Sequence, residues 1–380
     1  MRRAWPARLL ALGALALWLA SPALQAQELV AALGEQVLML PASGFTEPAL
    51  ELTVYRPTGQ GPFPVLLINH GRAPGNAHLQ PRYRPVLAAR EFVDRGYAVV
   101  VPMRQGFSQS GGQEINGGCN VASNGLMQAI SVHRTLAWLG TQPWADVSRN
   151  LVMGQSHGGL TTLAYGTAPH PGTRLLVNFA GGLRREECTA WQDGLIAAIA
   201  GYGEKSRLPS LWFYGDNDRY FSPYVFRGAH AGFVAAGGQA ELVAYGPFGS
   251  DSHAMFGSRA GLPIWLPRVL AAMAAVDLPV ARLQASDEPA DLPAPPPSGF
   301  ARVDELDRVP LRTDRAREGY ASWLRAESPK AFAIHAGQGN WASASGGERP
   351  IARALANCER FAKAACRLYA VDEAVVWSPE

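Results

Sequence analysis

The feature that most limits the possible folds is an alternation of short apolar runs with segments of helical pattern, between Val37 and Ala275. The clearest runs are FPVLLIN (63–69), YAVVVP (97–102), NLVMG (150–154), RLLVNF (174–179) and LWFYG (211–215). Continuous apolar runs indicate strands that are buried on both faces, and such strands alternating with helices form a mostly parallel sheet. We therefore expect residues 27–278 to form an α/β domain with helices on both faces of the sheet.

The chain changes character after this region. Residues 279–300 are rich in Pro, Ala and Asp, and their PAPPPSG sequence cannot sustain a helix or a strand, which predicts a stiff linker. Residues 301–380 combine two helical patterns with a strand-like end, RLYAVDEAVVW. This part predicts a small C-terminal α+β domain, and nothing in its sequence indicates its role.

The first residues have the layout of a secretory signal peptide. A basic start precedes an apolar run from Leu9 to Ala20, and small residues end at Ala26. The run is too short to span a bilayer comfortably, although a retained N-terminal anchor is the alternative. We expect residues 1–26 to be removed and the mature protein to be exported, either periplasmic or secreted, without a membrane span.

Charge gives no reason to expect a nucleic-acid partner. The chain has a net charge of +3, and Arg2, Arg3 and Arg8 lie in the expected signal peptide, which contains no acidic residue. The mature chain is therefore close to neutral, whereas nucleic-acid binding relies on an excess of positive charge. A small molecule is the expected partner, and the sequence does not indicate an oligomeric state.

Four cysteines remain in the mature chain. An even number in an exported protein favours disulfides, and the pairing most local in sequence joins Cys119 to Cys188 and Cys358 to Cys366. Buried free thiols are the alternative. The spacing of the cysteines does not match a zinc site, so no metal is expected.

Candidate catalytic residues begin with Ser156, which lies in the sequence GQSHG between a predicted strand and a predicted helix. Gly154 and Gly158 lie two residues before and after it. This G-x-S-x-G pattern is typical of a nucleophile elbow, a tight turn in which a side chain at either glycine would collide with the backbone. Because glycine is abundant in this chain, a purely structural turn is the alternative, but the flanking strand and helix favour a catalytic serine.

A catalytic serine needs a base and an orienting acid, which in this kind of fold follow it in the order Ser, Asp, His. Asp218 follows the strand SLWFYG, and His253 follows the next strand, ELVAY. We expect Asp218 to be the acid, with Asp216 as the second choice, and His253 to be the base.

Two backbone N–H groups are expected to bind the oxyanion. They belong to Arg72, which follows the strand that ends in LLINHG, and to His157, directly after the serine. An ordinary turn at residues 70–72 is the alternative.

These motifs together, INHGRAP, RGYAVVVPMRQGFSQSGG, GQSHGG, YGDND and DSHAMF, resemble the α/β-hydrolase superfamily over about residues 37–275. The similarity is greatest to its dienelactone-hydrolase-like branch, and it extends to exported carboxylesterases and prolyl-oligopeptidase-type peptidases. Dienelactone hydrolases use a cysteine nucleophile, whereas this chain has Ser156. The resemblance therefore implies serine esterase chemistry rather than dienelactone hydrolysis.

The expected function is cleavage of carboxylic esters through an acyl-enzyme on Ser156, without a cofactor or a metal. A peptidase acting on short peptides is the first alternative, although such enzymes usually carry a gating domain before the catalytic one. A non-catalytic binding protein on the same scaffold is the second alternative. We expect residues 183–207 to form substrate-contacting loops or a small cap.

Overall fold

The structure, a computed structural model, describes residues 29–44, 46–284, 291–326, 328–335, 337, 339–346 and 349–379. The expected signal peptide, residues 1–26, lies outside the described residues. Within the described ranges, no helix combines the length and the apolar character that crossing a membrane would require.

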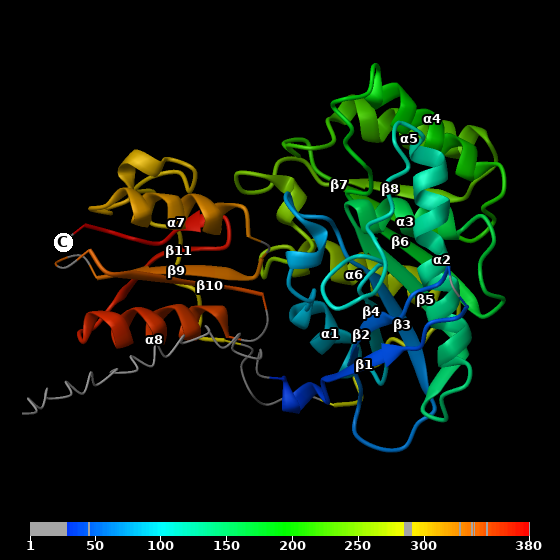
Figure 1. Cartoon of the computed structure of the whole chain (residues 1–380), viewed down its shortest axis with the longest axis horizontal. Helices are drawn as coiled ribbons and strands as arrows, with labels where there is room; N and C mark the ends of the chain where they lie inside the picture. The colour runs from blue at the N-terminus through cyan, green and yellow to red at the C-terminus, as the bar shows by residue number, and fades with distance from the viewer. Residues whose placement is uncertain are drawn as a thin grey trace, which may run out of the picture.

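A large mixed sheet forms the centre of the first domain (Figure 1). Its strand order is β1-β2-β4-β3-β5-β6-β7-β8, and every neighbouring pair from β4 to β8 is parallel, while β2 is antiparallel to both of its neighbours. The strands are β1 (Gln36–Leu40), β2 (Leu50–Tyr55), β3 (Phe63–Asn69), β4 (Ala98–Pro102), β5 (Ala145–Gln155), β6 (Thr173–Phe179), β7 (Ser210–Tyr214) and β8 (Ala240–Ala244). The expected α/β fold is confirmed.

Helices cover both faces of this sheet, as continuous apolar strands require. One face packs against α2 (Val121–Leu139), α3 (His157–Tyr165), α4 (Trp191–Gly203) and α5 (Pro223–Ala235), and the other against α1 (Val86–Val93) and α6 (Leu262–Ala274). The strand β3 illustrates the division, because Val65 and Leu67 point into the first core while Leu66 and Ile68 point into the second. Single-turn 3₁₀ helices lie at Ala31–Leu33, Ala77–Leu79, Ser252–Ala254 and Leu306–Arg308.

The expectation of substrate-contacting loops or a cap at residues 183–207 is wrong for most of that segment. Residues 191–203 form the helix α4, and its Leu195, Ile199 and Tyr202 are buried in the core beside α2 and α5. The segment contains Gly194, Gly201 and Gly203, which lower its intrinsic helix propensity and hide the helix from a sequence pattern. The helix α4 is therefore stabilised by its packing against α5 rather than by the helix propensity of its own residues.

The C-terminal domain is a four-stranded antiparallel sheet with one helix on each face (Figure 1). Its elements are α7 (Asp314–Leu324), β9 (Lys330–Ile334), β10 (Trp341–Ser345), α8 (Pro350–Ala362), β11 (Arg367–Val371) and β12 (Ala374–Val375), with the sheet order β10-β9-β11-β12. On β9, Phe332 and Ile334 pack towards α7, whereas Ala331 and Ala333 pack towards α8. The expected small α+β domain is confirmed.

The linker between the domains is anchored, which its composition did not predict. The buried carboxylate of Asp291 accepts hydrogen bonds from the backbone N–H groups of Ile351 and Ala352, at 2.7 and 3.0 Å, in the first turn of α8. It also lies 3.3 Å from the guanidinium of Arg259 in the first domain. Asp291 therefore ties the first turn of one domain's helix to a loop of the other domain.

Both expected disulfides, Cys119–Cys188 and Cys358–Cys366, are present. The first joins the loop before α2 to the loop before α4, and the second joins α8 to the residue preceding β11. Each bridge closes a segment that packs on its own domain, so each is expected to stabilise that domain alone.

Replacing both Cys358 and Cys366 by alanine is expected to lower the free energy of unfolding of the C-terminal domain by about 2–3 kcal/mol, because the unfolded chain regains the freedom of an open loop. Hydrogen–deuterium exchange in peptides from residues 350–377 should then be faster. The matched control replaces Cys119 and Cys188 and should leave exchange in these peptides unchanged. Equal exchange rates in the two variants would contradict the claim that the Cys358–Cys366 bridge specifically stabilises the C-terminal domain.

Candidate active site

Ser156 lies at a sharp turn between the end of β5 and the start of α3. Its backbone has φ +55° and ψ −125°, a conformation that residues with a side chain rarely adopt. A Cβ at Gly154 would lie 2.1 Å from the carbonyl oxygen of Gly158, and a Cβ at Gly158 would lie 2.1 Å from that of Asn69. Both flanking glycines are therefore required by close backbone contact, which is the reason that the sequence pattern suggested.

His253 and Asp218 come together on two neighbouring loops. His253 Nδ1 lies 2.9 Å from Asp218 Oδ2, and the carboxylate of Asp218 is fully buried. Since a carboxylate can only accept, Nδ1 carries a proton, and in the neutral ring Nε2 is then the acceptor. The other oxygen of Asp218 accepts from the backbone N–H groups of Tyr220 (2.7 Å) and Phe221 (3.0 Å), so the carboxylate is held in place.

Asp216, the second choice for the orienting acid, lies elsewhere. Its side chain is 46% exposed and 3.7 Å from Arg227, at the start of the same Asp-Asn-Asp turn. A third carboxylate near the site, Asp251, accepts from the backbone N–H of His253 at 3.0 Å. Burial raises the pKa of Asp251. Of the two candidates, only Asp218 is bonded to the imidazole of His253.

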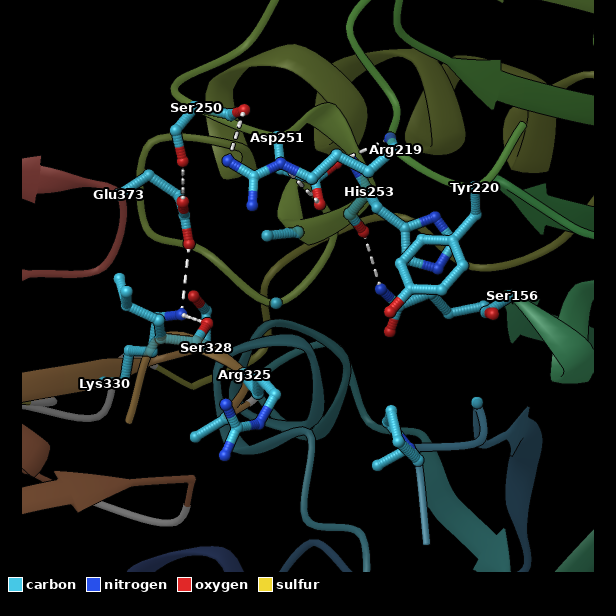
Figure 2. Close-up of a pocket in the computed structure, with 18 of the residues that line it drawn as sticks. Ser156, Arg219, Tyr220, Ser250, Asp251, His253, Arg325, Ser328, Lys330 and Glu373 are labelled. Atoms are coloured by element: carbon cyan, nitrogen blue, oxygen red, sulfur yellow. Dashed lines mark hydrogen bonds and ion pairs between the residues drawn. The ribbon is translucent and has the colours of Figure 1, made fainter. Parts of the chain in front are cut away.

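Ser156 and His253 line the same cavity, which has a volume of about 220 Å³ (Figure 2). Gln155, the residue before the serine, donates from Nε2 to the backbone carbonyl of His253 at 2.8 Å. The ring of Tyr220 lies against the imidazole of His253, with ring centroids 4.5 Å apart. The base is therefore held by a hydrogen bond from the strand that carries the nucleophile and by an aromatic contact on one face.

Of the two expected oxyanion donors, His157 follows Ser156 directly in the chain, and Arg72 lies on the loop after β3. Arg72 lines the cavity together with Ser156, and its side chain turns to Glu114, with Nη2 3.1 Å from Oε2. His157 is the first residue of α3, so its backbone N–H has no acceptor within the helix. Its buried ring is bonded to Asn124 Oδ1 at 2.7 Å, and burial holds its pKa well below the ordinary value. Both residues leave their backbone N–H groups as the candidate donors.

The sequence analysis missed a buried arginine beside this loop. Arg104 is fully buried, and its Nη2 donates to the carbonyl oxygen of Gly71 at 3.0 Å. His70 Nδ1 donates to the same oxygen at 2.7 Å, while His70 Nε2 accepts from the backbone N–H of Arg104 at 2.9 Å. Burial lowers the pKa of Arg104 to about 9, so the guanidinium is charged at neutral pH.

This arrangement bears on the oxyanion donor because Gly71 C=O and Arg72 N–H belong to one planar peptide unit. Two donors on the carbonyl fix the plane of that unit, and the N–H on its opposite side is thereby fixed as well. Arg104 follows directly after the strand YAVVVP and one methionine, where charged residues often reach a site at the sheet edge. That position was the only available signal, and it does not show that the side chain turns inward.

The group has the components needed for nucleophilic acyl transfer. Ser156 offers a hydroxyl, His253 an acceptor nitrogen and Asp218 a buried carboxylate that orients the ring. The backbone near Arg72 and His157 offers donors for a developing negative charge.

Comparison with known proteins agrees with this chemistry in part. The sequence model of the S15 family, X-Pro dipeptidyl-peptidase, matches residues 48–216, which is less than half of the chain. The matched range includes Ser156 but neither Asp218 nor His253. None of the curated proteins matches the chain in sequence.

Solved structures with a similar fold include both esterases and peptidases. A Klebsiella pneumoniae protein described as a dienelactone hydrolase is 18% identical, with a TM-score of 0.47, covering 63% of this chain and 98% of its own. The Pyrococcus horikoshii acylaminoacyl peptidase is 15% identical (TM-score 0.49; 64% of this chain and 42% of its own), so this chain spans less than half of that peptidase. The Pyrococcus furiosus esterase Pf2001 is 13% identical, with a TM-score of 0.47, and the match covers 64% of this chain and 91% of the esterase. Likenesses of this size do not distinguish between the activities.

Replacing Arg104 by methionine is expected to lower kcat about ten- to a hundredfold with little change in KM, because a misaligned donor weakens binding of the oxyanion more than binding of substrate. The measurement is steady-state hydrolysis of 4-nitrophenyl acetate. Arg134→Met is the matched control, since Arg134 also donates to loop carbonyls, such as that of Pro48 at 2.8 Å, but does not line the cavity. A change in KM alone, or equal losses in both variants, would argue against this role.

Proposed function

We propose that this protein, a member of the α/β-hydrolase superfamily, cleaves carboxylic esters through an acyl-enzyme on Ser156. Two observations carry the proposal: Ser156 and His253 line one cavity, and the imidazole of His253 is bonded to the buried carboxylate of Asp218. These residues are far apart in the sequence, and a serine on a strained turn that shares a cavity with an oriented imidazole is what a serine hydrolase requires.

In the first half of the proposed reaction, Ser156 Oγ attacks the ester carbonyl while His253 Nε2 takes the hydroxyl proton. The carbonyl electron pair moves onto the oxygen, where the backbone N–H groups of Arg72 and His157 bind it. The C–O bond to the alcohol then breaks, His253 gives its proton to the leaving oxygen, and an acyl ester on Ser156 remains. Asp218 stays ionised and keeps Nδ1–H oriented throughout.

In the second half, water attacks the acyl carbonyl while His253 Nε2 accepts its proton. The tetrahedral intermediate uses the same two backbone donors. It collapses with release of the acid, and His253 returns the proton to Ser156 Oγ. Every proton is thus transferred by His253, and the residues of the site suffice for both halves.

The cavity favours small substrates. Its volume of about 220 Å³ lies below the range of about 300–1,000 Å³ that is usual for sites of drug-sized ligands. A short acyl chain fits this space better than a long one, so we propose that short-chain esters are preferred.

The match to the S15 family favours a peptidase as the second candidate function. A peptidase that acts near the amino end of its substrate needs an acidic group to bind the terminal ammonium. The acids in this cavity already have partners: Asp251 accepts from His253 N–H, Asp304 lies 3.3 Å from Arg219, and Glu373 binds Ser250 and Lys330. Because these carboxylates are already bonded, the ammonium of a peptide would have to compete with their partners. This favours an ester over a peptide as the substrate.

Export is part of the proposal. Disulfides form and persist in oxidising compartments, and the two bridges of this chain support a periplasmic or secreted location. The expected signal peptide would provide the route. Finding a mature N-terminus close to Gln27 in protein recovered outside the cytoplasm would test it.

Ser156→Ala is expected to lower kcat for 4-nitrophenyl acetate by about four to six orders of magnitude without unfolding the protein, since the reaction loses its nucleophile. Asp218→Asn should lower kcat by about three to four orders of magnitude, because an amide would hold the imidazole in the wrong tautomer. Both are measured by steady-state kinetics beside a circular dichroism spectrum.

Asp216→Asn is the matched control, since it makes the same change in the same turn without touching His253. Its kcat should stay within about twofold of the unmodified protein, as surface changes away from a site usually have small effects. Retained turnover in Ser156→Ala would exclude Ser156 as the nucleophile. Equal losses at Asp216 and Asp218 would exclude the assignment of the acid.

A further inference from the structure

The cavity at Ser156 is bordered on one side by the C-terminal domain. Its lining residues from that domain are Asp304, Leu324, Arg325, Ala326, Ser328, Lys330 and Glu373. Figure 2 shows Lys330 and Glu373 across the cavity from Ser156. The segment that was expected to cover the site, residues 183–207, contributes no residue to this lining.

One attachment between the domains runs through Glu373. Its carboxylate accepts from Ser250 Oγ at 2.5 Å and lies 3.2 Å from Lys330 Nζ (Figure 2). Ser250 is three residues before His253, on the loop that carries the proposed base. Lys330 begins β9 of the C-terminal domain and is only 3% exposed. Lys330 Nζ also donates to the backbone carbonyl of Leu324 at 2.8 Å, so Glu373 connects Ser250 of the first domain to a buried cation that is fixed in the second domain. Loss of the Glu373 carboxylate would leave that cation without its counter-charge.

A second attachment lies beside the proposed acid. Arg219, the residue after Asp218, places Nη2 3.3 Å from Asp304 Oδ2 of the C-terminal domain. Further along the His253 loop, a Cβ at Gly257 would lie 2.6 Å from the carbonyl oxygen of Ser328, so the two backbones pack directly against each other. The C-terminal domain therefore rests on both loops that hold the His253–Asp218 pair.

We infer that the C-terminal domain is a wall of the active site, fastened to the His253 loop by Glu373, and that this wall sets the upper size of the ester. The inference rests on the proposed function. Ala326 and Leu324 form the apolar part of the wall, so their volumes determine how long an acyl or alcohol chain the cavity admits. Glu373 is a positioning residue, because it acts on the reaction only through the loop that carries His253.

The wall is tested by changing its volume in the full-length protein. Leu324→Ala enlarges the cavity and is expected to raise the ratio of kcat/KM for 4-nitrophenyl octanoate to that for 4-nitrophenyl acetate about tenfold, the scale on which pockets discriminate chain length. Ala326→Phe fills the cavity and should lower the same ratio by about as much. Opposite shifts from two substitutions on one wall cannot arise from a general loss of folding.

The attachment is tested with Glu373→Gln, which keeps the shape of the side chain but removes its charge. Loss of the negative charge should weaken the contacts of Glu373 with Ser250 and Lys330 and so loosen the wall. The ratio of kcat/KM for the octanoate to that for the acetate should then rise. The kcat for the acetate should fall severalfold, because the loop that carries His253 loses a support. The matched control is Glu318→Gln on α7, which makes the same charge change at an exposed residue of the same domain. The control should change neither quantity.

The outcomes separate this inference from the proposed function. If the unmodified protein shows no Ser156-dependent turnover of 4-nitrophenyl acetate, the proposed function fails, and the wall is then not at an active site. If that turnover is present but the ratio is the same in Leu324→Ala, Ala326→Phe and the unmodified protein, the wall inference is overturned. An effect of Glu373→Gln no larger than that of Glu318→Gln would overturn the attachment through Glu373.

Discussion

Close packing of backbone around Gly154 and Gly158 holds Ser156 at a positive φ, and the same packing positions the loop that carries Arg72. The carbonyl oxygens of Asn69 and His70 would both lie within 2.6 Å of a Cβ at Gly158, so the end of β3 is pressed against the start of α3. This contact brings the loop with Arg72 to the nucleophile. The parallel order of the strands then directs the loops after β7 and β8 to the same edge of the sheet.

Sequence reasoning could predict the parts of the site that depend on chain order. Apolar runs predicted the parallel sheet, and the order of strands placed Asp218 and His253 at strand ends near Ser156. Sequence reasoning could not predict the contacts of Arg104 with Gly71 or of Gln155 with His253. A charged or polar residue after a strand is expected to be solvent-exposed unless its packing is known. The helix α4 was missed for a related reason, because its stability comes from contact with α5 rather than from its own residues.

The position of the C-terminal domain is the other property that no local pattern contains. Its sequence predicted helices and strands, but the docking includes single polar contacts such as Glu373 with Ser250 and Asp291 with Arg259. These residues lie in segments that look like ordinary turns or linkers. The consequence is chemical as well as structural, because the domain borders the cavity into which Ser156 and His253 face.

The most direct test of the central claim is to map where an organophosphorus inhibitor attaches. Diisopropyl fluorophosphate reacts with a serine whose hydroxyl is activated by a neighbouring imidazole. The protein should gain one phosphoryl group, located by peptide mass spectrometry at Ser156, and the His253→Ala variant should gain none in the same time. An unmodified Ser156, or equal labelling of Ser156 in the variant, would contradict the account.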